Sequence, residues 1–545
     1  MLVAVEKRRK KKEKKKEKIL TETQSVCPEC FLDEKPRLLP AEIIERDGKV
    51  WIRRECPEHG KIEELYWGSS KMYKKAKKYA HDGPRILNPQ LKVENPLCPL
   101  SCGYCGIHQS GPALGNLVVT NRCDLNCWYC FFFAEKAGYV YEPSLNQIRE
   151  MVRNFTRVRP VPGKALQITG GEPAMRDDIV DIIKLVKGEG VTHVQFNTDG
   201  IKLATSPKFP SRLRKAGVNT VYLSFDGTTP KTNPKNHWEA PYAVQNCRRA
   251  GLGVVFVPTV IRSVNDHDLG NIVRVAFDNI DIVRGVNFQP VSLTGRITRR
   301  ERGKLRITSP DVIKMIEEQT DGQIAKEDWY TCPATTGLSH LVEALTGRSQ
   351  FELTNHFACG LATYVFKDNG KLIPITRFVD VDGFVEYANE KAYEISSGKN
   401  RLITSLKILL NLRRFIDNKR KPKYLKLWRI LVNVLLRHDY SALGSFHTKC
   451  ILLGIMHFMD LYNYDVERVK RCNIVYLSPD GRIIPFCAFN TLSMLYRDKI
   501  QLKYGSTVEE YVKARGADLK ADLYRRDLKT LRSGDIYQKF YGVVS

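Results

Sequence analysis

Apolar runs and amphipathic stretches alternate between about residue 115 and residue 292. The stretches 144–155 and 177–190 carry a helical period, the second with apolar residues at i, i+3, i+4 and i+7. Repeated strand–helix units with fully apolar strands predict a parallel α/β sheet, open or closed into an incomplete barrel. The six predicted strands are 116–120, 165–169, 193–198, 220–225, 253–260 and 285–290.

Three cysteines follow the first predicted strand at its carboxyl end. Cys123, Cys127 and Cys130 have the spacing C-x-x-x-C-x-x-C. Ligands of parallel α/β folds bind at the carboxyl ends of the strands. Three thiolates hold three irons of a [4Fe–4S] cluster and leave the fourth iron open. The pattern therefore predicts a cluster that binds a further molecule, which a structural cluster does not do.

These cysteines and a second motif resemble the radical S-adenosylmethionine (SAM) superfamily over Leu117 to Gln289. Tyr129 supplies the aromatic residue before the last cysteine, and "TGGEP" supplies the Gly-Gly-Glu signature at 170–172. The resemblance implies a partial (β/α)6 barrel of the TIM type, a catalytic [4Fe–4S] cluster and SAM as cofactor. It also implies reductive cleavage of SAM, followed by abstraction of hydrogen from an unactivated C–H bond.

The second motif also makes chemical sense beside an open iron. Gly170 and Gly171 let a ligand approach the backbone, and Glu172 can accept a hydrogen bond from the ammonium group of SAM. Other strand ends carry polar residues at positions that the resemblance assigns to SAM binding, although Asn, Asp and Ser are also common in turns. These residues are Thr198, Ser224, Asp226 and Asn265.

The segment before the barrel carries a Cys3His pattern. Cys27, Cys30, Cys56 and His59 have the number and spacing of a small metal site. Zinc is the expected ion, and a rubredoxin-like iron is the alternative, because sulfur-rich tetrahedral ligation suits both. The segment has too little apolar content to fold without its metal, so we expect the ion to be structural.

Eight further cysteines predict two auxiliary [4Fe–4S] clusters. The distal sequences 359–375 and 472–487 each contain a cysteine, a strand, a DNG or PDG turn and a return strand, as in a β-hairpin. They resemble the cysteine-bearing hairpins of SPASM and twitch domains. Spacing does not tell which distal cysteine completes the proximal triple, and Cys247 is expected to be a core thiol. The eight are Cys98, Cys102, Cys105, Cys332, Cys359, Cys450, Cys472 and Cys487.

Charge and amphipathic character suggest an acidic partner. The net charge is +27, part of it in the lysine run 7–18, which is expected to be disordered. Residues 401–440 predict two basic amphipathic helices broken at Pro422, lying either in a membrane interface or against the protein. Residues 451–465 predict a nearly all-apolar helix. No run reaches the roughly 20 apolar residues of a membrane span.

The whole arrangement of cysteines and basic segments resembles archaeal tetraether lipid synthases. That resemblance implies an anionic archaeal phospholipid as substrate and coupling of two sp3 carbons at terminal methyl groups. It also implies an electron donor such as ferredoxin and a cytoplasmic enzyme on the inner face of the membrane. The alternative is a radical SAM methyltransferase or maturase acting on a pterin, a peptide or RNA. The sequence contains no recognisable RNA-binding module, which argues against nucleic acid.

The sequence therefore divides into four regions. A basic tail precedes an amino-terminal metal-binding domain with the Cys3His site and the first C-x-x-x-C-x-x-C motif. The radical SAM core follows, and an auxiliary iron–sulfur and lipid-binding region with additional helices ends the chain. The boundaries are 1–20, 21–114, 115–300 and 301–545.

Overall fold

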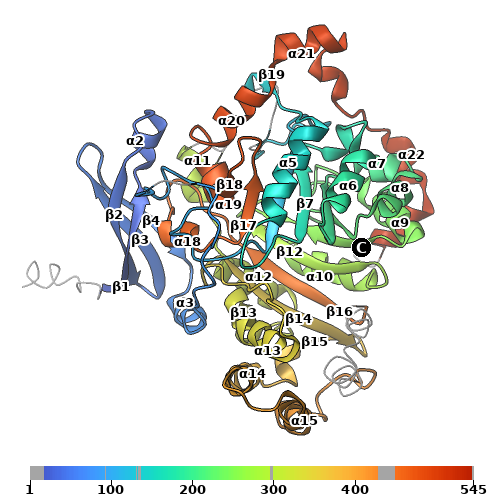
Figure 1. Ribbon diagram of the computed structural model, residues 1–545. Coiled ribbons are helices and arrows are strands. Elements are labelled where there is room, and N and C mark those ends of the chain that lie inside the picture. The colour runs from blue at the N-terminus through green and yellow to red at the C-terminus, as the bar shows by residue number, and fades with distance from the viewer. Residues whose placement is uncertain are drawn as a thin grey trace, which may run out of the picture.

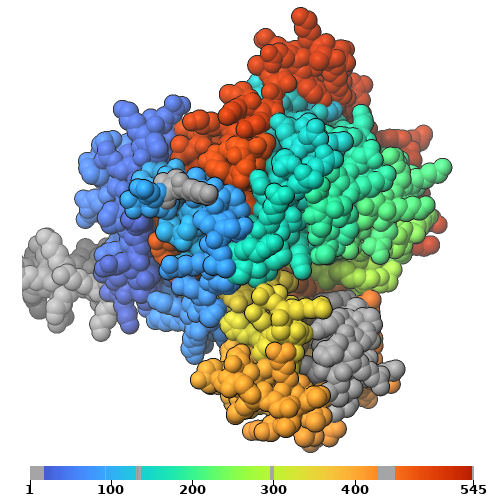
Figure 2. Space-filling model, in the orientation of Figure 1, coloured from blue at the N-terminus to red at the C-terminus, as the bar shows by residue number. Residues whose placement is uncertain are grey.

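The computed structural model describes residues 17–91, 94–130, 132, 137–294, 299–426 and 448–542. The chain begins with a four-stranded antiparallel sheet in the order β1-β2-β3-β4. Its strands are β1 (Lys18–Val26), β2 (Leu38–Arg46), β3 (Lys49–Cys56) and β4 (Gly60–Trp67). The short helix α2 (Pro28–Leu32) follows β1, and α3 (Ser70–Lys77) follows β4. Figures 1 and 2 show this sheet as a separate lobe on the side of the molecule.

The amino-terminal sheet shares a hydrophobic core with the rest of the protein. Tyr66, Trp67 and Tyr73 are buried in the same cluster as the strands of the main sheet. The Arg54 guanidinium donates to the carbonyl oxygens of Val26 and Tyr462, each at 2.9 Å. These contacts hold the sheet against the carboxyl-terminal part of the chain.

Six parallel strands form the predicted barrel core, each at a position where the hydrophobic pattern places it. They follow the order β12-β10-β9-β8-β7-β5, with parallel register between neighbours. Apolar side chains fill these strands because both faces of a parallel sheet are covered. The strands are β5 (Leu114–Thr120), β7 (Ala165–Gly170), β8 (His193–Thr198), β9 (Thr220–Ser224), β10 (Gly253–Val257) and β12 (Val283–Pro290).

Helices cover the outer face of this barrel (Figure 1). In α5, Ser144 and Gln147 form a capping box at the amino terminus, and Ile148, Val152 and Phe155 face the core. The short β11 (Thr259–Val260) pairs in parallel with the end of β12, at Gln289 and Pro290. The covering helices are α5 (Leu145–Thr156), α6 (Ile179–Gly188), α7 (Ile201–Thr205), α8 (Phe209–Ala216), α9 (Ala240–Ala250) and α10 (Leu269–Asp278).

Both predicted cysteine hairpins form, and both extend the barrel sheet at its edges. β14 (Gly360–Asp368) pairs with β15 (Lys371–Pro374), and β17 (Ile474–Leu477) pairs with β18 (Ile483–Pro485). β17 runs parallel to β5 at one edge of the core. At the other edge β14 is joined to β12 through β16 (Cys450–Met456) and pairs with β13 (Tyr330–Thr331). The hairpins therefore bring the distal cysteines beside the barrel.

The prediction of an apolar helix over 451–465 is wrong. Residues 450–456 form β16, which pairs in parallel with β12 and antiparallel with β14. A short, continuous apolar run fits a fully paired central strand as well as a buried helix, and its period does not distinguish the two. Pairing along both edges favours the strand, because the neighbouring strands provide hydrogen-bond partners for the backbone N–H and C=O groups of residues 450–456.

A helical unit projects from the barrel between β12 and β16 (Figure 2). α15 packs Ile408 and Leu409 against Ala392 and Ile395 of α14, while Leu410 is 74% exposed. Residues 427–440 of the predicted basic amphipathic segment lie outside the described residues. The helices of this unit are α13 (Thr336–Thr346), α14 (Val381–Ser396) and α15 (Arg401–Asn411), whereas α11 (Arg299–Leu305) precedes α12 (Ser309–Gln319), which packs on α10 and β12 of the barrel.

The carboxyl-terminal segment wraps back onto the barrel. β19 (Ser506–Thr507) pairs with β6 (Tyr139–Val140). The Tyr541 hydroxyl donates to the carbonyl of His237 at 2.9 Å and so fixes the last helix near α9. The helices of this segment are α18 (Val466–Lys470), α19 (Phe486–Thr491), α20 (Arg497–Tyr504), α21 (Val508–Arg515), α22 (Leu528–Ser533) and α23 (Asp535–Tyr541).

Candidate functional site: a zinc ribbon, a barrel cavity and three groups of cysteines

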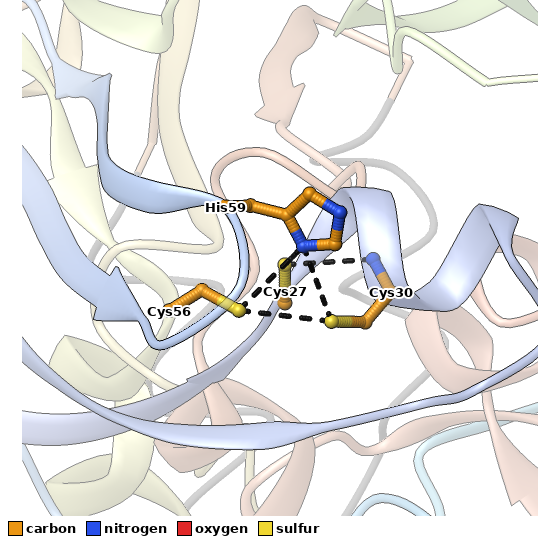
Figure 3. Close-up of side chains that lie close together, drawn as sticks. All are labelled: Cys27, Cys30, Cys56 and His59. Atoms are coloured by element: carbon orange, nitrogen blue, oxygen red, sulfur yellow. Dashed lines mark hydrogen bonds between the residues drawn. The ribbon is translucent and has the colours of Figure 1, made fainter.

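The four residues of the predicted Cys3His site converge on one point (Figure 3). His59 Nδ1 lies 3.6, 3.4 and 3.6 Å from the sulfurs of Cys27, Cys30 and Cys56, and the sulfurs of Cys30 and Cys56 are 3.7 Å apart. A tetrahedral zinc with ordinary bond lengths would separate sulfur from nitrogen by about 3.6 Å and sulfur from sulfur by about 3.8 Å. The residues therefore fit a single zinc ion.

Local backbone geometry prepares these ligands. Cys27 caps α2, and its sulfur accepts from the amide of Cys30 at 3.5 Å. Burial raises the pKa of Cys30 to about 12, with the Cys27 and Cys56 thiols adding to the effect. Burial also opposes ionisation of Cys56, but hydrogen bonds from the amides of Glu58 and His59 lower its pKa to about 6.

The loop that carries Cys123, Cys127 and Cys130 packs directly on the predicted Gly-Gly pair. A Cβ atom on Gly170 would lie 2.0 Å from the carbonyl oxygen of Thr120, and one on Gly171 would lie 2.1 Å from that of Arg122. Both distances exclude a side chain. The glycines are therefore required for the contact between β7 and the start of the cysteine loop, a reason that the sequence did not provide.

Glu172 is buried and holds three segments together. Its carboxylate accepts from the amide of Ala174 at 2.9 Å, the hydroxyl of Thr198 at 2.9 Å and the amide of Asp199 at 2.8 Å. Its own amide donates to the carbonyl of Arg122 at 2.8 Å. Burial, together with the nearby Asp124 carboxylate, raises the pKa of Glu172 to about 8.

A second buried network surrounds Tyr129. Its hydroxyl donates to the carboxylate of Asp226, which also accepts from the Lys235 ammonium at 3.1 Å and the Thr259 amide at 2.9 Å. The Asn265 amide group donates to the carbonyls of Asp226 and Thr259, both at 2.8 Å. Asn265 thus holds the backbone at Asp226 and at Thr259 in place from behind the cavity wall.

One cavity of about 380 Å³ occupies the inside of the barrel. Among the predicted site residues, the three cysteines of the loop, Tyr129, Gly170, Gly171, Thr198 and Ser224 line it, whereas Glu172, Asp226 and Asn265 lie behind its wall. The wall also carries amide side chains and aromatic rings from nearly every strand. These are Asn116, Gln167, Asn197, Tyr222, Asn287, Gln289, Phe458, Tyr476, Phe486 and Asn490.

Two ionisable residues at this cavity were not predicted from the sequence. Lys235 lines it, with its ammonium 5.2 Å from the centre of the Tyr129 ring. Burial opposes its charge, but Asp226, Tyr129 and the Cys127 thiol hold the pKa of Lys235 well above its ordinary value. Asp199 lies within 4.8 Å of Cys123 and Asp124. Neither residue belongs to a recognisable motif, so only the fold brings them to the site.

The proximal cysteines lie near one another, and Cys472 lies near both this triple and the distal thiols of Cys359 and Cys487. Burial holds the pKa of Cys102 well above its ordinary value, and the thiols of Cys98, Cys105 and Cys472 add to the effect. The Tyr496 hydroxyl accepts from the amide of Cys102 at 2.9 Å and anchors this loop. The β17–β18 hairpin thus brings a distal thiol to the proximal triple.

A further group of thiols includes one that lines the cavity. Burial, and then the Cys359 thiol, raise the pKa of Cys332 to about 12. The Cys487 thiol lines the cavity. Burial raises its pKa, and the thiols of Cys472 and Cys359 add to the effect. The buried Arg468 guanidinium donates to the Cys359 sulfur at 3.2 Å. The structure therefore connects Cys332, Cys359 and Cys487 through neighbouring contacts.

Cys450 does not join the other distal cysteines. Cys450 pairs with Phe366 of β14. Gly360, which follows Cys359, pairs with Met456 at the other end of β16. About 20 Å of strand therefore separates Cys450 from Cys359. Cys450 packs instead with Phe378 and Leu425. Cys247 is buried in the main core, as predicted.

Comparison with known proteins places these sites in a family. A model described as the radical SAM superfamily matches residues 117–276, and one described as the HMPTM N-terminal zinc ribbon domain matches residues 19–68. The chain is 45% identical over 500 residues to 7,8-dihydro-6-hydroxymethylpterin dimethyltransferase of Methanocaldococcus jannaschii, covering 90% of this chain and 96% of that protein. The chain belongs to the family of this dimethyltransferase. It is a radical SAM enzyme with an amino-terminal zinc ribbon.

More distant relatives share the barrel region. The chain is 28% identical over 187 residues to GTP 3',8-cyclase of Petrotoga mobilis, covering 33% of this chain and 57% of that protein. Among solved structures, the [FeFe]-hydrogenase maturase HydG is 17% identical, with a TM-score of 0.31 over 39% of this chain and 50% of the maturase.

The expected relationship to tetraether lipid synthases is wrong. The relative that matches nearly the whole chain is described as a pterin dimethyltransferase, so the predicted phospholipid substrate, sp3 carbon coupling and membrane-surface partner are corrected. The alternative prediction, a methyltransferase or maturase for a pterin, a peptide or RNA, agrees better with this relative.

One structural fact bears on this correction. The apolar run 451–465 begins with the central strand β16, so it does not form the predicted apolar helix. No helix within the described ranges combines the length and apolar character needed to cross a membrane.

Proposed function

We propose that this enzyme methylates the carbon framework of a reduced pterin, with SAM as cofactor. The proposal rests on the 45% identity to 7,8-dihydro-6-hydroxymethylpterin dimethyltransferase over 96% of that protein. Within the structure, the observation that carries it is the chemistry of the barrel cavity. That cavity must accept a flat, polar bicycle whose pyrimidine edge contains both hydrogen-bond donors and acceptors.

Amide side chains are suited to such an edge, because each offers donors and an acceptor in one plane. Asn287 and Gln289 from β12, Gln167 from β7 and Asn490 from α19 all line the cavity. The Asn490 amide nitrogen donates to the Tyr476 hydroxyl at 3.3 Å, but within the described residues its buried carbonyl oxygen has no hydrogen-bond partner. A buried acceptor without a donor is costly, and an N–H group of a pterin would satisfy it.

The aromatic wall of the cavity supports the same class of substrate. The Phe458 and Phe486 rings stack 3.9 Å apart at an interplanar angle of 20°. Such a platform favours contact with a further planar ring.

The cofactor assignments follow from the family and from the cysteine groups. Cys123, Cys127 and Cys130 would hold the [4Fe–4S] cluster, and Tyr129, Gly170, Gly171, Thr198 and Ser224 would line the SAM site. Glu172, Asp226 and Asn265 would position the loops of this site from behind its wall. When bound, the cluster and SAM supply a carbon radical through one-electron reduction. The chain's own residues must orient the pterin and exclude water from the cavity.

The distal cysteines would hold the auxiliary clusters. Cys98, Cys102 and Cys105 with Cys472 make one ligand set, and Cys332, Cys359 and Cys487 make the thiols of a second. The second set would face the substrate, because Cys487 lines the cavity. Cys450 lies too far along β16 to take part in the second set.

Calorimetric titration with 7,8-dihydro-6-hydroxymethylpterin tests the proposed substrate site. Asn490→Leu should weaken binding about 5- to 150-fold, because an unpaired buried polar group costs about 1–3 kcal/mol. The matched control is Asn146→Leu, at an exposed position near the start of α5, which should bind like the unmodified enzyme. Absence of pterin binding by the unmodified enzyme, with GTP tested in parallel, would contradict the proposal.

A further inference from the structure

Three potential metal ligands meet outside the zinc ribbon and the cysteine groups. His81 lies in the segment after α3, His340 lies on α13, and Glu352 lies between α13 and β14. Their ligand atoms all lie within 4.8 Å of one another. The three residues come from separate parts of the sequence, so their approach results from the fold. The amino-terminal region and the α13 region meet along one face of the molecule (Figure 2).

The distances fit a small transition-metal ion. His340 Nε2 and Glu352 Oε1 are 3.1 Å apart, and the two histidine rings meet edge to face with their centres 5.3 Å apart. Nitrogen and oxygen ligands of a tetrahedral zinc are separated by about 3.3 Å when the bonds are about 2.0 to 2.1 Å. Two histidines and one carboxylate form a common donor set for zinc and for iron(II).

A simple ion pair between His340 and Glu352 does not explain the position of His81. Within the part of the chain that the structure describes, the His81 ring nitrogens make no hydrogen bond or ion pair, although the ring lies against His340. A shared metal ion would bind both rings beside the same carboxylate, which accounts for their approach. The placement of His81 thus favours an ion.

Residues around the three ligands provide the support that metal sites require. The Asn389 side chain on α14 also lies beside His340, and metal-binding histidines are commonly oriented by a second partner. The Glu352 side chain is 11% exposed, so its carboxylate is held in place.

We propose that His81, His340 and Glu352 bind one divalent transition-metal ion, zinc by default, at a site distinct from the zinc ribbon. Three protein ligands would leave a position for water. His81 also lines a second cavity of about 410 Å³, so the ion would lie at the rim of that cavity. This inference does not depend on the identity of the substrate.

The site would fasten together the segments that carry two predicted cluster ligands. Cys332 stands immediately before α13, and Cys359 follows Glu352 by one short loop. An ion at the three ligands would tie both segments to the amino-terminal region through His81. Its expected role is therefore to hold the Cys332 and Cys359 thiols at a fixed separation.

Zinc binding to the anaerobically purified holoprotein tests the proposal. The full chain, with its zinc ribbon and iron–sulfur sites filled, is dialysed against ⁶⁵Zn²⁺, and bound zinc is counted per chain. The unmodified protein should take up one additional zinc, and His81→Ala, His340→Ala and Glu352→Gln should each weaken that uptake at least about 100-fold. His267→Ala removes a histidine that contacts a single aspartate and should not change uptake.

The second-partner variant separates a specific site from surface adsorption. Asn389→Ala should weaken zinc uptake about 10- to 100-fold, because loss of an orienting partner has that effect at known sites. His81 is exposed, so its alanine variant should keep the metal-free unfolding midpoint of the unmodified protein. No additional zinc on the unmodified protein, or unchanged zinc uptake by His81→Ala, would overturn the proposal.

Discussion

Two adjacent glycines define the cysteine loop at the scale of single residues. The Gly170 and Gly171 Cα positions press against the carbonyl oxygens of Thr120 and Arg122. The sequence motif was enough to predict that these glycines belong to the site, but their contact partners follow only from the pairing of β5 with β7. Lys235 and Asp199 could not be predicted, because their role depends on neighbours far along the chain.

Gly171→Ala should destabilise the enzyme by about 1–3 kcal/mol, since the new methyl group must displace the Arg122 carbonyl or move the loop. Thermal or denaturant unfolding measures the change. The matched control is Gly188→Ala at the end of α6, where a Cβ would have no atom within 4 Å and helix propensity favours alanine. Equal stability of the two variants would show that the close approach to the cysteine loop is not a constraint.

Lys235→Met should make reduction of the radical SAM cluster more difficult. The Lys235 ammonium is buried beside Tyr129 and acts on the Cys127 and Cys130 thiols, so its loss removes positive charge that favours an added electron. An effect of about 1–2 kcal/mol corresponds to a potential lower by about 40–90 mV. Redox titration followed by electron paramagnetic resonance measures it. Lys231→Met, at an exposed position, should leave the potential unchanged; an unchanged potential in Lys235→Met would exclude this role.

At the scale of elements, turn chemistry and the alternation of strands with helices were better guides than an isolated apolar run. The DNG and PDG turns predicted both cysteine hairpins, and the strands alternating with helices predicted the six core strands. The run 451–465 could not be assigned in the same way, because its apolar residues suit a helix and a central strand equally. Its place between β12 and β14 is a long-range pairing that local sequence does not encode.

Removal of zinc from the ribbon should loosen its two cysteine turns without unfolding its sheet. Tyr66 and Trp67 of β4 stay anchored in the main core, whereas the turns at 27–33 and 56–60 depend on the ion. Hydrogen exchange after treatment with a zinc chelator should show a loss of about 2 kcal/mol or more of protection in the turns. Retained protection in β4 is the other half of the expectation. Exchange throughout β1 to β4 would instead show that the metal holds the whole sheet.

At the scale of the whole molecule, the barrel sheet is completed from the distant carboxyl-terminal half of the chain. β16 and β17 flank the six-stranded core, and the hairpins at the two edges bring Cys359, Cys472 and Cys487 to the barrel. The sequence predicted clusters at these cysteines, yet the assembly of one cavity between them and the cysteine loop required the fold. The amide side chains that line the cavity come from positions between Asn116 and Asn490, so spacing along the chain cannot group them, and the substrate could not be predicted from them.

The attachment of the last helix should depend on pH. Burial lowers the pKa of His237 to about 4, and its Nε2 lies 2.9 Å from the Tyr537 hydroxyl, with Asp268, Arg526 and Arg532 nearby. An unfolded histidine titrates near 6.5, so this residue's stability contribution is complete above about pH 6.5 and is lost as pH falls toward 4, by at most about 1.4 kcal/mol per pH unit.

Unfolding measured between pH 7 and pH 4 checks this dependence. His237→Gln should be less stable at pH 7 and should show a weaker decline on acidification, whereas His267→Gln, at an exposed position, should follow the unmodified enzyme. Parallel curves for His237→Gln and the unmodified enzyme would rule out this histidine as a source of the pH dependence.

Turnover under anaerobic conditions tests the central claim most directly. The reconstituted enzyme is reduced with dithionite and supplied with SAM and 7,8-dihydro-6-hydroxymethylpterin, and 5′-deoxyadenosine and pterin mass are followed together. The account predicts a pterin heavier by one or two methyl groups, and no product from Cys123→Ala. Formation of 5′-deoxyadenosine with an unchanged pterin, or with consumption of an archaeal phospholipid supplied in a parallel reaction, would contradict it.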